Sequence, residues 1–163
     1  MYILELTCIY LYVCRSGKSS IERVVFHKMS PHETLFLEST NSLDIHYIAN
    51  NNLVKFQTWD FGGDMNLTSD VTYMNQQISI DTIFKLANTL VYVIDAQEED
   101  YQNDLPHLVE TILTAHKINP SLHFEVFLHK VDGDFMSDET KAERQQVNKI
   151  NKFIMLHKLD LIY

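Results

Sequence analysis

The sequence predicts an α/β domain with a mostly parallel central sheet flanked by helices. Apolar stretches rich in β-branched and aromatic residues alternate with helical patterns, which is the order that a parallel sheet requires. The stretch 89–96 is apolar almost throughout, so it is expected as a central strand buried on both faces. The chain has 163 residues, 45% of them hydrophobic, which suits one domain with a sizeable core.

The first third of the chain is expected to hold a strand, a helix and an antiparallel pair of strands. Residues 3–13 are apolar apart from one glutamate and lack the basic leader of a signal peptide, so they are interpreted as the first strand. A helix is expected at 19–28, with Pro31 ending it. Strands are expected at 42–47 and 53–59, joined by an Asn-rich turn.

The remainder alternates helix and strand. Residues 64–81 have few periodic apolar positions and are predicted to be mobile. Helices are expected near 78–87 and 105–117, where apolar residues recur at helical spacing. Pro120 opens the loop into another strand at 124–132.

A phosphate-binding loop is predicted directly after the first strand. Gly17 allows the backbone to wrap around phosphate, Lys18 offers a cation for the β- and γ-phosphates, and Ser19 offers a hydroxyl for Mg²⁺. Tyr12 stands where the full pattern has a glycine, so the match is partial. The predicted nucleotide-contacting run is Arg15, Ser16, Gly17, Lys18, Ser19 and Ser20.

Two later motifs follow in the order of a guanine-nucleotide switch. Asp60 ends an apolar strand, where it would hold Mg²⁺ through water, and the Gly63 N–H would meet a γ-phosphate. His129, Lys130 and Asp132 resemble the Asn/Thr-Lys-x-Asp motif that reads guanine. The Asp132 carboxylate could accept both N–H groups of the guanine edge, while the stem of Lys130 could lie along the ring.

These motifs, together with the runs 25–40 and 124–133, resemble the Rag GTPases, and among them the RagC/RagD type. The resemblance implies a P-loop NTPase fold of the small GTPase kind. It implies that Thr40 is the switch threonine, ligating Mg²⁺ together with Ser19 and covering the γ-phosphate of GTP. The residues that act in hydrolysis would be Lys18, Thr40, Gly63 and Asp64.

The resemblance also implies partners and a location. A Rag protein of this type would bind GTP or GDP with Mg²⁺ and form a heterodimer with a RagA/RagB-type subunit. In amino-acid signalling such a heterodimer recruits the TOR kinase complex to a scaffold on the lysosomal surface. The chain is therefore expected in the cytoplasm and at the lysosome.

The sequence departs from the family pattern at several places. Asp64 stands where active switch GTPases carry a water-orienting glutamine, so slow hydrolysis is expected, and Asp64→Gln should accelerate it. Gly62 replaces a proline of the Rag pattern. Residues 1–14 form an atypical first strand, and 134–163 are too short for the last elements and for the C-terminal roadblock-type domain. The sheet is therefore expected to be incomplete at its C-terminal edge.

Two alternatives remain open at this point. Tyr12 and Asp64 could impair the nucleotide site and leave a non-cycling interaction subunit. The run ending in Gly62 and Gly63 is also similar to Arf-type trafficking GTPases. That alternative is disfavoured because no N-terminal amphipathic helix is apparent and Tyr2 occupies the position where myristoylation needs glycine.

Composition excludes some other classes of function. The formal net charge of −9, without a basic cluster, disfavours nucleic-acid binding and direct membrane insertion. Cys8 and Cys14 are too few for a disulfide framework and are expected as reduced thiols. Four histidines have no ligand partner at metal spacing along the sequence and are expected at the surface or in the core: His27, His107, His116 and His123.

Overall fold

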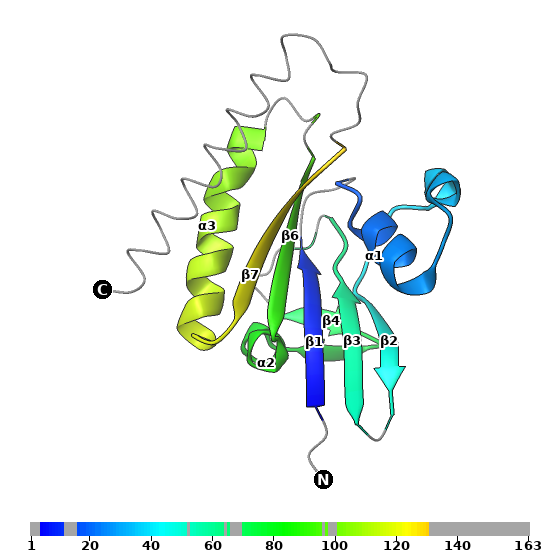
Figure 1. Cartoon of the computed structure of the whole chain (residues 1–163). Helices are drawn as coiled ribbons and strands as arrows, with labels where there is room; N and C mark the ends of the chain where they lie inside the picture. Colours follow the sequence, from blue (N-terminus) through cyan, green and yellow to red (C-terminus); the bar gives the residue numbers. More distant parts are fainter. Residues whose placement is uncertain are drawn as a thin grey trace.

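The computed structural model describes residues 4–11, 16–51, 53–63, 65, 70–95, 97 and 101–130. Within this part of the chain, five strands form one sheet in the order β2-β3-β1-β6-β7 (Figure 1). Only β2 runs antiparallel to its neighbour, which confirms the mostly parallel sheet predicted above. The five strands are β1 (Leu4–Leu11), β2 (Asp44–Asn50), β3 (Val54–Asp60), β6 (Thr89–Asp95) and β7 (His123–His129).

Helices cover both faces of the sheet, as the burial of β6 shows. Val91 and Val93 pack against Ile21 and Phe26 of helix α1 (Lys18–His27). Successive side chains of a strand point to opposite faces. The alternate residues of β6 accordingly join a larger cluster with helices α2 (Ile80–Leu86) and α3 (Tyr101–Ile118).

The larger core cluster lies between the sheet and these two helices. Its central side chains, such as Phe61, Phe84 and Tyr92, are almost completely buried. Trp59 at the end of β3 is 5% exposed. The buried members of the cluster are Leu43, Trp59, Phe61, Val71, Ile83, Phe84, Ala87, Leu90, Tyr92, Ile94, Leu108, Ile112, Ala115 and Leu122.

Helix α1 ends for a different reason than the one predicted from the sequence. The helix ends at His27 because Lys28 adopts a left-handed conformation, and its N–H donates back to the Arg23 carbonyl. Pro31 lies beyond this cap and instead begins a short 3₁₀-helix, η1 (Pro31–Phe36), which the sequence did not predict. Proline suits that position because it lacks the backbone N–H, which in any other residue would have no partner within the helix there.

The segment 64–81, predicted to be mobile, contains regular structure where it is described. Strands β4 (Val71–Tyr73) and β5 (Gln76–Ile78) form a separate hairpin, and α2 begins at Ile80. Met74 and Asn75 have positive φ angles, as a tight two-residue hairpin turn requires. Strands of three residues are too short to show an alternating pattern, so the prediction missed them.

Two further differences concern element boundaries. Helix α3 begins at Tyr101 rather than near residue 105, with Pro106 inside it, a position that sequence rules disfavour. Strand β2 extends to Asn50, and the turn after it is closed by Asn51, whose side-chain oxygen accepts the N–H groups of Leu53 and Val54.

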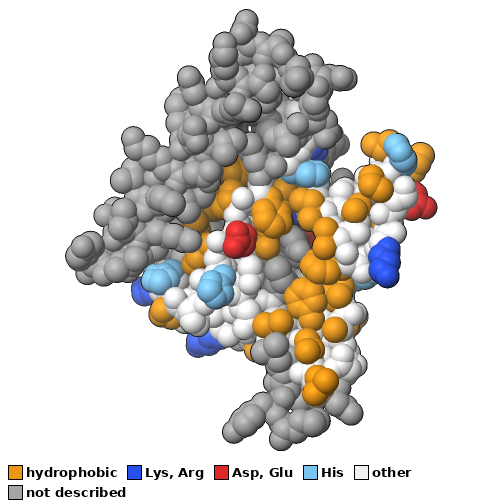
Figure 2. All heavy atoms as spheres, viewed as in Figure 1, with side chains coloured by type: hydrophobic (Ala, Val, Ile, Leu, Met, Phe, Trp, Pro, Cys, Tyr) orange, Lys and Arg blue, Asp and Glu red, His pale blue; other side chains and the backbone are white. Residues whose placement is uncertain are grey.

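The surface of the described part carries exposed apolar groups. Figure 2 shows a band of hydrophobic side chains over the sheet and a further group at the outer end of η1. In η1, Leu35 is 80% exposed and Phe36 is 85% exposed. Among the described residues, no helix has both the length and the apolar composition needed to cross a bilayer.

Candidate functional site

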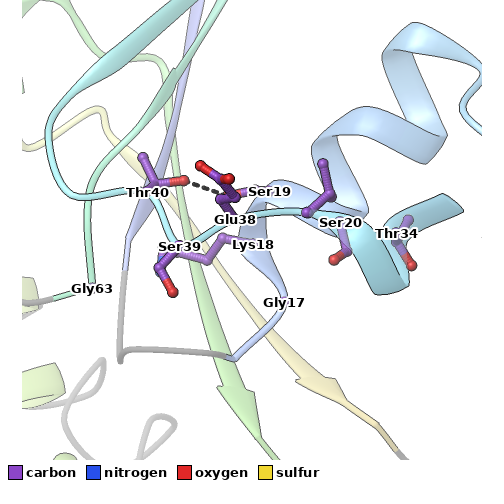
Figure 3. Close-up of a pocket in the computed structure, with 10 residues that line it drawn as sticks. Gly17, Lys18, Ser19, Ser20, Thr34, Glu38, Ser39, Thr40 and Gly63 are labelled. Carbon is purple, nitrogen blue, oxygen red and sulfur yellow. Dashed lines mark hydrogen bonds between the residues drawn. The ribbon is translucent and has the colours of Figure 1, made fainter.

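A cavity of about 200 Å³ opens at the N-terminus of α1, where the first turn of that helix faces the segment that follows η1 (Figure 3). The first N–H groups of a helix have no partner within the helix, and they favour an anion bound at that end. The residues lining the cavity are Gly17, Lys18, Ser19, Ser20, Thr34, Leu37, Glu38, Ser39, Thr40 and Gly63.

Three oxygen-bearing side chains meet beside this cavity, although they come from three different segments. The hydroxyl of Ser19, in the first turn of α1, lies 2.8 Å from that of Thr40 (Figure 3). Ser19 also donates a hydrogen bond to Asp60 at the end of β3. Thr40 Oγ1 lies 3.3 Å from the same Asp60 oxygen. The structure thus brings together the three residues that the sequence predicted as Mg²⁺ ligands.

The carboxylate of Asp60 is buried beside these two hydroxyls. Asp60 is 2% exposed, and its Oδ1 atom is buried without a hydrogen-bond partner among the described residues. Burial raises the pKa of this carboxyl, while the Ser19 hydroxyl, the Lys18 charge and the Thr40 hydroxyl oppose the rise. A set of hydroxyl and carboxylate oxygens with one orphaned acceptor fits a hard dication such as Mg²⁺.

Gly17 is the point at which the phosphate-loop candidate contacts the end of β7. It is the N-cap of α1 and has a φ of 93°, a conformation that favours glycine. A Cβ on Gly17 would lie 2.3 Å from Nδ1 of His129, and this nitrogen is 2.8 Å from the Ser16 carbonyl. His129, predicted from the base-reading motif, therefore packs directly on the loop.

Lys130 follows β7 and is held by an ion pair with β6. Its ammonium group lies 2.5 Å from Asp95 Oδ2, and its carbonyl accepts a hydrogen bond from the Gln97 side chain at 3.1 Å. Lys130 itself has a φ of 60°. These contacts place His129 and Lys130, the described part of the predicted base-reading segment, at the carboxyl ends of the parallel strands, the edge at which α/β proteins bind ligands.

The segment before β2 is joined to the end of β3 through Gly62. The Gly62 N–H donates to the Ser42 carbonyl at 3.1 Å. A Cβ on Gly62 would lie only 2.8 Å from the Thr40 carbonyl oxygen and 2.9 Å from the carbonyl carbon of Asn41. The close approach of two backbones holds Thr40 beside Asp60.

Most of the predicted site residues in the described part gather here, and the sequence missed several others. The run Gly17 to Ser20, Thr40 and Gly63 line the cavity, and Ser16 is buried next to them. The lining residues at positions 34 and 37–39 lie in the run 25–40 that supported the family resemblance, but no role in the site was predicted for them. Four positions discussed for the nucleotide site lie outside the described residues: Tyr12, Arg15, Asp64 and Asp132.

Comparison with known proteins decides the family. The family model described as the Gtr1/RagA G protein conserved region matches residues 13–163. The chain belongs to this family. Membership implies the P-loop NTPase fold, which agrees with the parallel sheet and the loop at Gly17.

Within the family, the chain is of the RagC/RagD type. It is 50% identical over 132 residues to Ras-related GTP-binding protein C of Mus musculus, covering 81% of this chain and 31% of that protein. The fission yeast GTP-binding protein gtr2 is 43% identical over 81% of this chain and 38% of its own length. Identity to GTP-binding protein GTR1 of Saccharomyces cerevisiae is 26%, over 72% of this chain and 36% of that protein. The chain thus spans about a third of the length of these relatives, and the comparison favours the Rag prediction over the Arf-like one.

Proposed function

We propose that the chain is a GTPase domain of RagC/RagD type that binds GTP or GDP together with Mg²⁺ and hydrolyses GTP slowly. The observation that carries the proposal is the convergence of Ser19, Thr40 and Asp60 beside the cavity at the N-terminus of α1. The presence of Rag-type GTP-binding proteins among the relatives supports it.

Different residues of the site would bind different parts of the nucleotide and its Mg²⁺. The backbone from Gly17 to Ser20 and the Lys18 ammonium would hold the phosphates, because helix N–H groups and a cation favour negative charge. Ser19, Thr40 and Asp60 would hold Mg²⁺, which neutralises charge on the phosphate oxygens when it is bound. The Gly63 N–H would contact the γ-phosphate.

The base would lie at the ends of β6 and β7. His129, Lys130 and Asp132 would form the guanine site, with Asp132 accepting from the base. Arg15 and Ser16 would complete the phosphate loop. Asp64 would face the γ-phosphate, and repulsion between like charges there would keep hydrolysis slow.

The cellular role follows from the type of relative. A heterodimer with a RagA/RagB-type subunit, acting in amino-acid signalling to the TOR kinase complex, would bring the chain from the cytoplasm to the lysosomal scaffold. Thr40 would report the presence of the γ-phosphate, and the close backbone contact between its segment and Gly62 supports this role. A non-cycling subunit is the alternative, and it predicts little or no Mg²⁺-dependent nucleotide binding.

The proposal is tested by equilibrium binding of a fluorescent GDP analogue with excess Mg²⁺ and with a chelator. Wild type should bind more tightly with Mg²⁺, and Ser19→Ala should lose most of this difference because a ligand oxygen is removed. Ser121→Ala, a serine remote from the cavity, is the matched control and should behave as wild type. Binding that is equally weak with and without Mg²⁺ in wild type would instead support the non-cycling subunit.

A further inference from the structure

A second cluster of ligand atoms lies outside the nucleotide cavity, under the C-terminal half of α1. Glu22 of α1 is fully buried, although it carries a carboxylate. Its Oε1 atom accepts a hydrogen bond from Thr58 of β3 at 3.0 Å. Its Oε2 atom has no hydrogen-bond partner among the described residues, and the nearest cation is Arg23, with Nε at 3.8 Å. A buried charge of this kind is costly unless a cation compensates it.

Two histidines approach the same carboxylate. Nε2 of His27, at the end of α1, lies 2.8 Å from Glu22 Oε1, and Nδ1 of His46, on β2, lies 3.3 Å from that oxygen. The Nδ1 atom of His46 is buried and makes no hydrogen bond within the described part of the chain. The cluster thus brings two imidazole nitrogens to one oxygen of a buried carboxylate. It leaves two buried atoms, Glu22 Oε2 and His46 Nδ1, without a hydrogen bond among the described residues.

The fold explains why the sequence did not reveal this cluster. His27 was expected at the surface or in the core because it has no ligand partner at metal spacing. The third residue of the cluster, His46, is brought to Glu22 and His27 by the antiparallel pairing of β2 and β3. In that pairing His46 is the register partner of Thr58. The two imidazole rings meet edge to face, with centroids 5.2 Å apart and an interplanar angle of 74°.

We propose that Glu22, His27 and His46 bind a single transition-metal dication, with Zn²⁺ as the representative ion. Two imidazole nitrogens and one carboxylate oxygen form a donor set that Zn²⁺ prefers and that Mg²⁺ does not. One ligand atom from each residue lies within 4.8 Å of the others. A tetrahedral zinc site needs ligand atoms about 3.3 Å apart, so small side-chain rotations would suffice.

The two histidines are exposed enough for an ion to enter the cluster from solvent. The side chain of His27 is 33% exposed and that of His46 is 19% exposed, so an ion can reach the carboxylate from solvent. Arg23 is also partly exposed and can move its charge away from Glu22. The bound ion would link the end of α1 to β2 and would stabilise the folded state by linkage. The inference does not depend on the proposed nucleotide function.

The test is Zn²⁺ titration of the metal-free full chain against a chromophoric chelator, with excess Mg²⁺ and GDP present to occupy the other candidate cation site. Wild type should bind one equivalent of Zn²⁺, and its melting temperature should rise. His27→Gln and His46→Gln should each weaken binding about tenfold or more. His107→Gln, a change at an exposed histidine of α3, should not.

Melting curves without Zn²⁺ separate loss of the site from loss of the fold, since His27 is exposed enough for its replacement to leave a cooperative transition. Glu22→Gln is a further variant that keeps the side-chain shape and should also lose binding. The proposal is overturned if wild type takes up no Zn²⁺, or if the folded His27→Gln and His46→Gln proteins bind it as tightly as wild type. The proposal is also overturned if Mg²⁺ with GDP displaces Zn²⁺, because the Zn²⁺ would then have occupied the nucleotide site.

Discussion

Asp60 shows at the scale of one residue how the folded chain is prepared for a cation. Its carboxylate is buried beside two hydroxyls, and one of its oxygens has no partner among the described residues. Because burial raises the pKa of Asp60, the charged form is disfavoured in the folded state when no cation is present. A bound dication would reverse this preference.

The first prediction concerns Asp60→Asn without Mg²⁺ or nucleotide. The folded state binds a proton on Asp60 more tightly than the unfolded state does, so wild type loses stability as the pH rises through the folded pKa. The neutral variant avoids this loss. It should therefore be more stable than wild type near pH 7.5, with a smaller difference near pH 5.

Denaturant unfolding at the two pH values measures this effect. Asp70→Asn, a change at an exposed aspartate, is the control and should show no such dependence. Addition of Mg²⁺ and GDP should favour wild type over Asp60→Asn. A variant that is less stable than wild type at pH 7.5 without Mg²⁺ would refute the burial argument.

The second prediction concerns Gly17. In Gly17→Ala, the left-handed backbone costs about 1–2 kcal/mol, and the new methyl group meets the His129 ring. The combined loss of unfolding free energy should be about 2–4 kcal/mol. In a His129→Ala background only the backbone cost should remain.

A double-mutant cycle measured by denaturant unfolding isolates the contact between these two residues. The coupling free energy should be about 1 kcal/mol or more. Additive effects of the two substitutions would show that the loop and the end of β7 are not in contact.

At the scale of residues, the sequence singled out side chains that the fold brings together. Lys18 and Ser19 were predicted from their order along the chain, Asp60 from a later motif, and Thr40 from the family resemblance. Glu22 and His46 were not found, because 24 residues separate them and only the β2–β3 pairing brings them together.

At the scale of elements, the end of β3 holds the segment that carries Thr40. The Gly62 N–H and the Ser42 carbonyl join these two backbones, and no atom larger than hydrogen fits on the Gly62 Cα without displacing them. The position of Thr40 relative to Asp60 therefore depends on a contact between two loops rather than on a helix or strand.

The third prediction follows from this contact. Gly62→Ala should lower the free energy of unfolding by about 1–3 kcal/mol, because the neighbouring atoms are backbone and cannot rotate away. It should also weaken Mg²⁺-dependent GDP binding, since Thr40 would move away from Asp60. Thermal unfolding and GDP titration measure the two effects. If both the stability and the affinity stay at wild-type values, the two loops do not meet as described.

Element prediction was accurate for long apolar runs and poor for short or capped segments. Strand β6 was placed almost residue by residue because burial on both faces leaves a continuous apolar pattern. The hairpin of β4 and β5 and the 3₁₀-helix η1 were missed, since three to six residues cannot establish a period. The left-handed Lys28 that ends α1 gave no signal, because lysine rarely adopts that conformation.

At the scale of the whole molecule, the parallel sheet follows from the alternation of strands and helices. The order of the strands within the sheet was not predicted from the sequence. It places β1 at the centre, between β3 and β6, so that the start of α1 and the ends of β3, β6 and β7 lie at one edge. The candidate site is assembled at that edge from motifs that are more than 100 residues apart in the chain.

The most direct test of the proposed function is the melting temperature of the chain with Mg²⁺ and saturating GDP, GTP or ADP. A ligand that binds only the folded state raises the melting temperature by linkage. GDP and GTP should each raise it by several degrees, whereas ADP should leave it close to that of the nucleotide-free protein. A cooperative transition that guanine nucleotides do not shift, or that ADP shifts equally, would contradict the assignment of a guanine-nucleotide site.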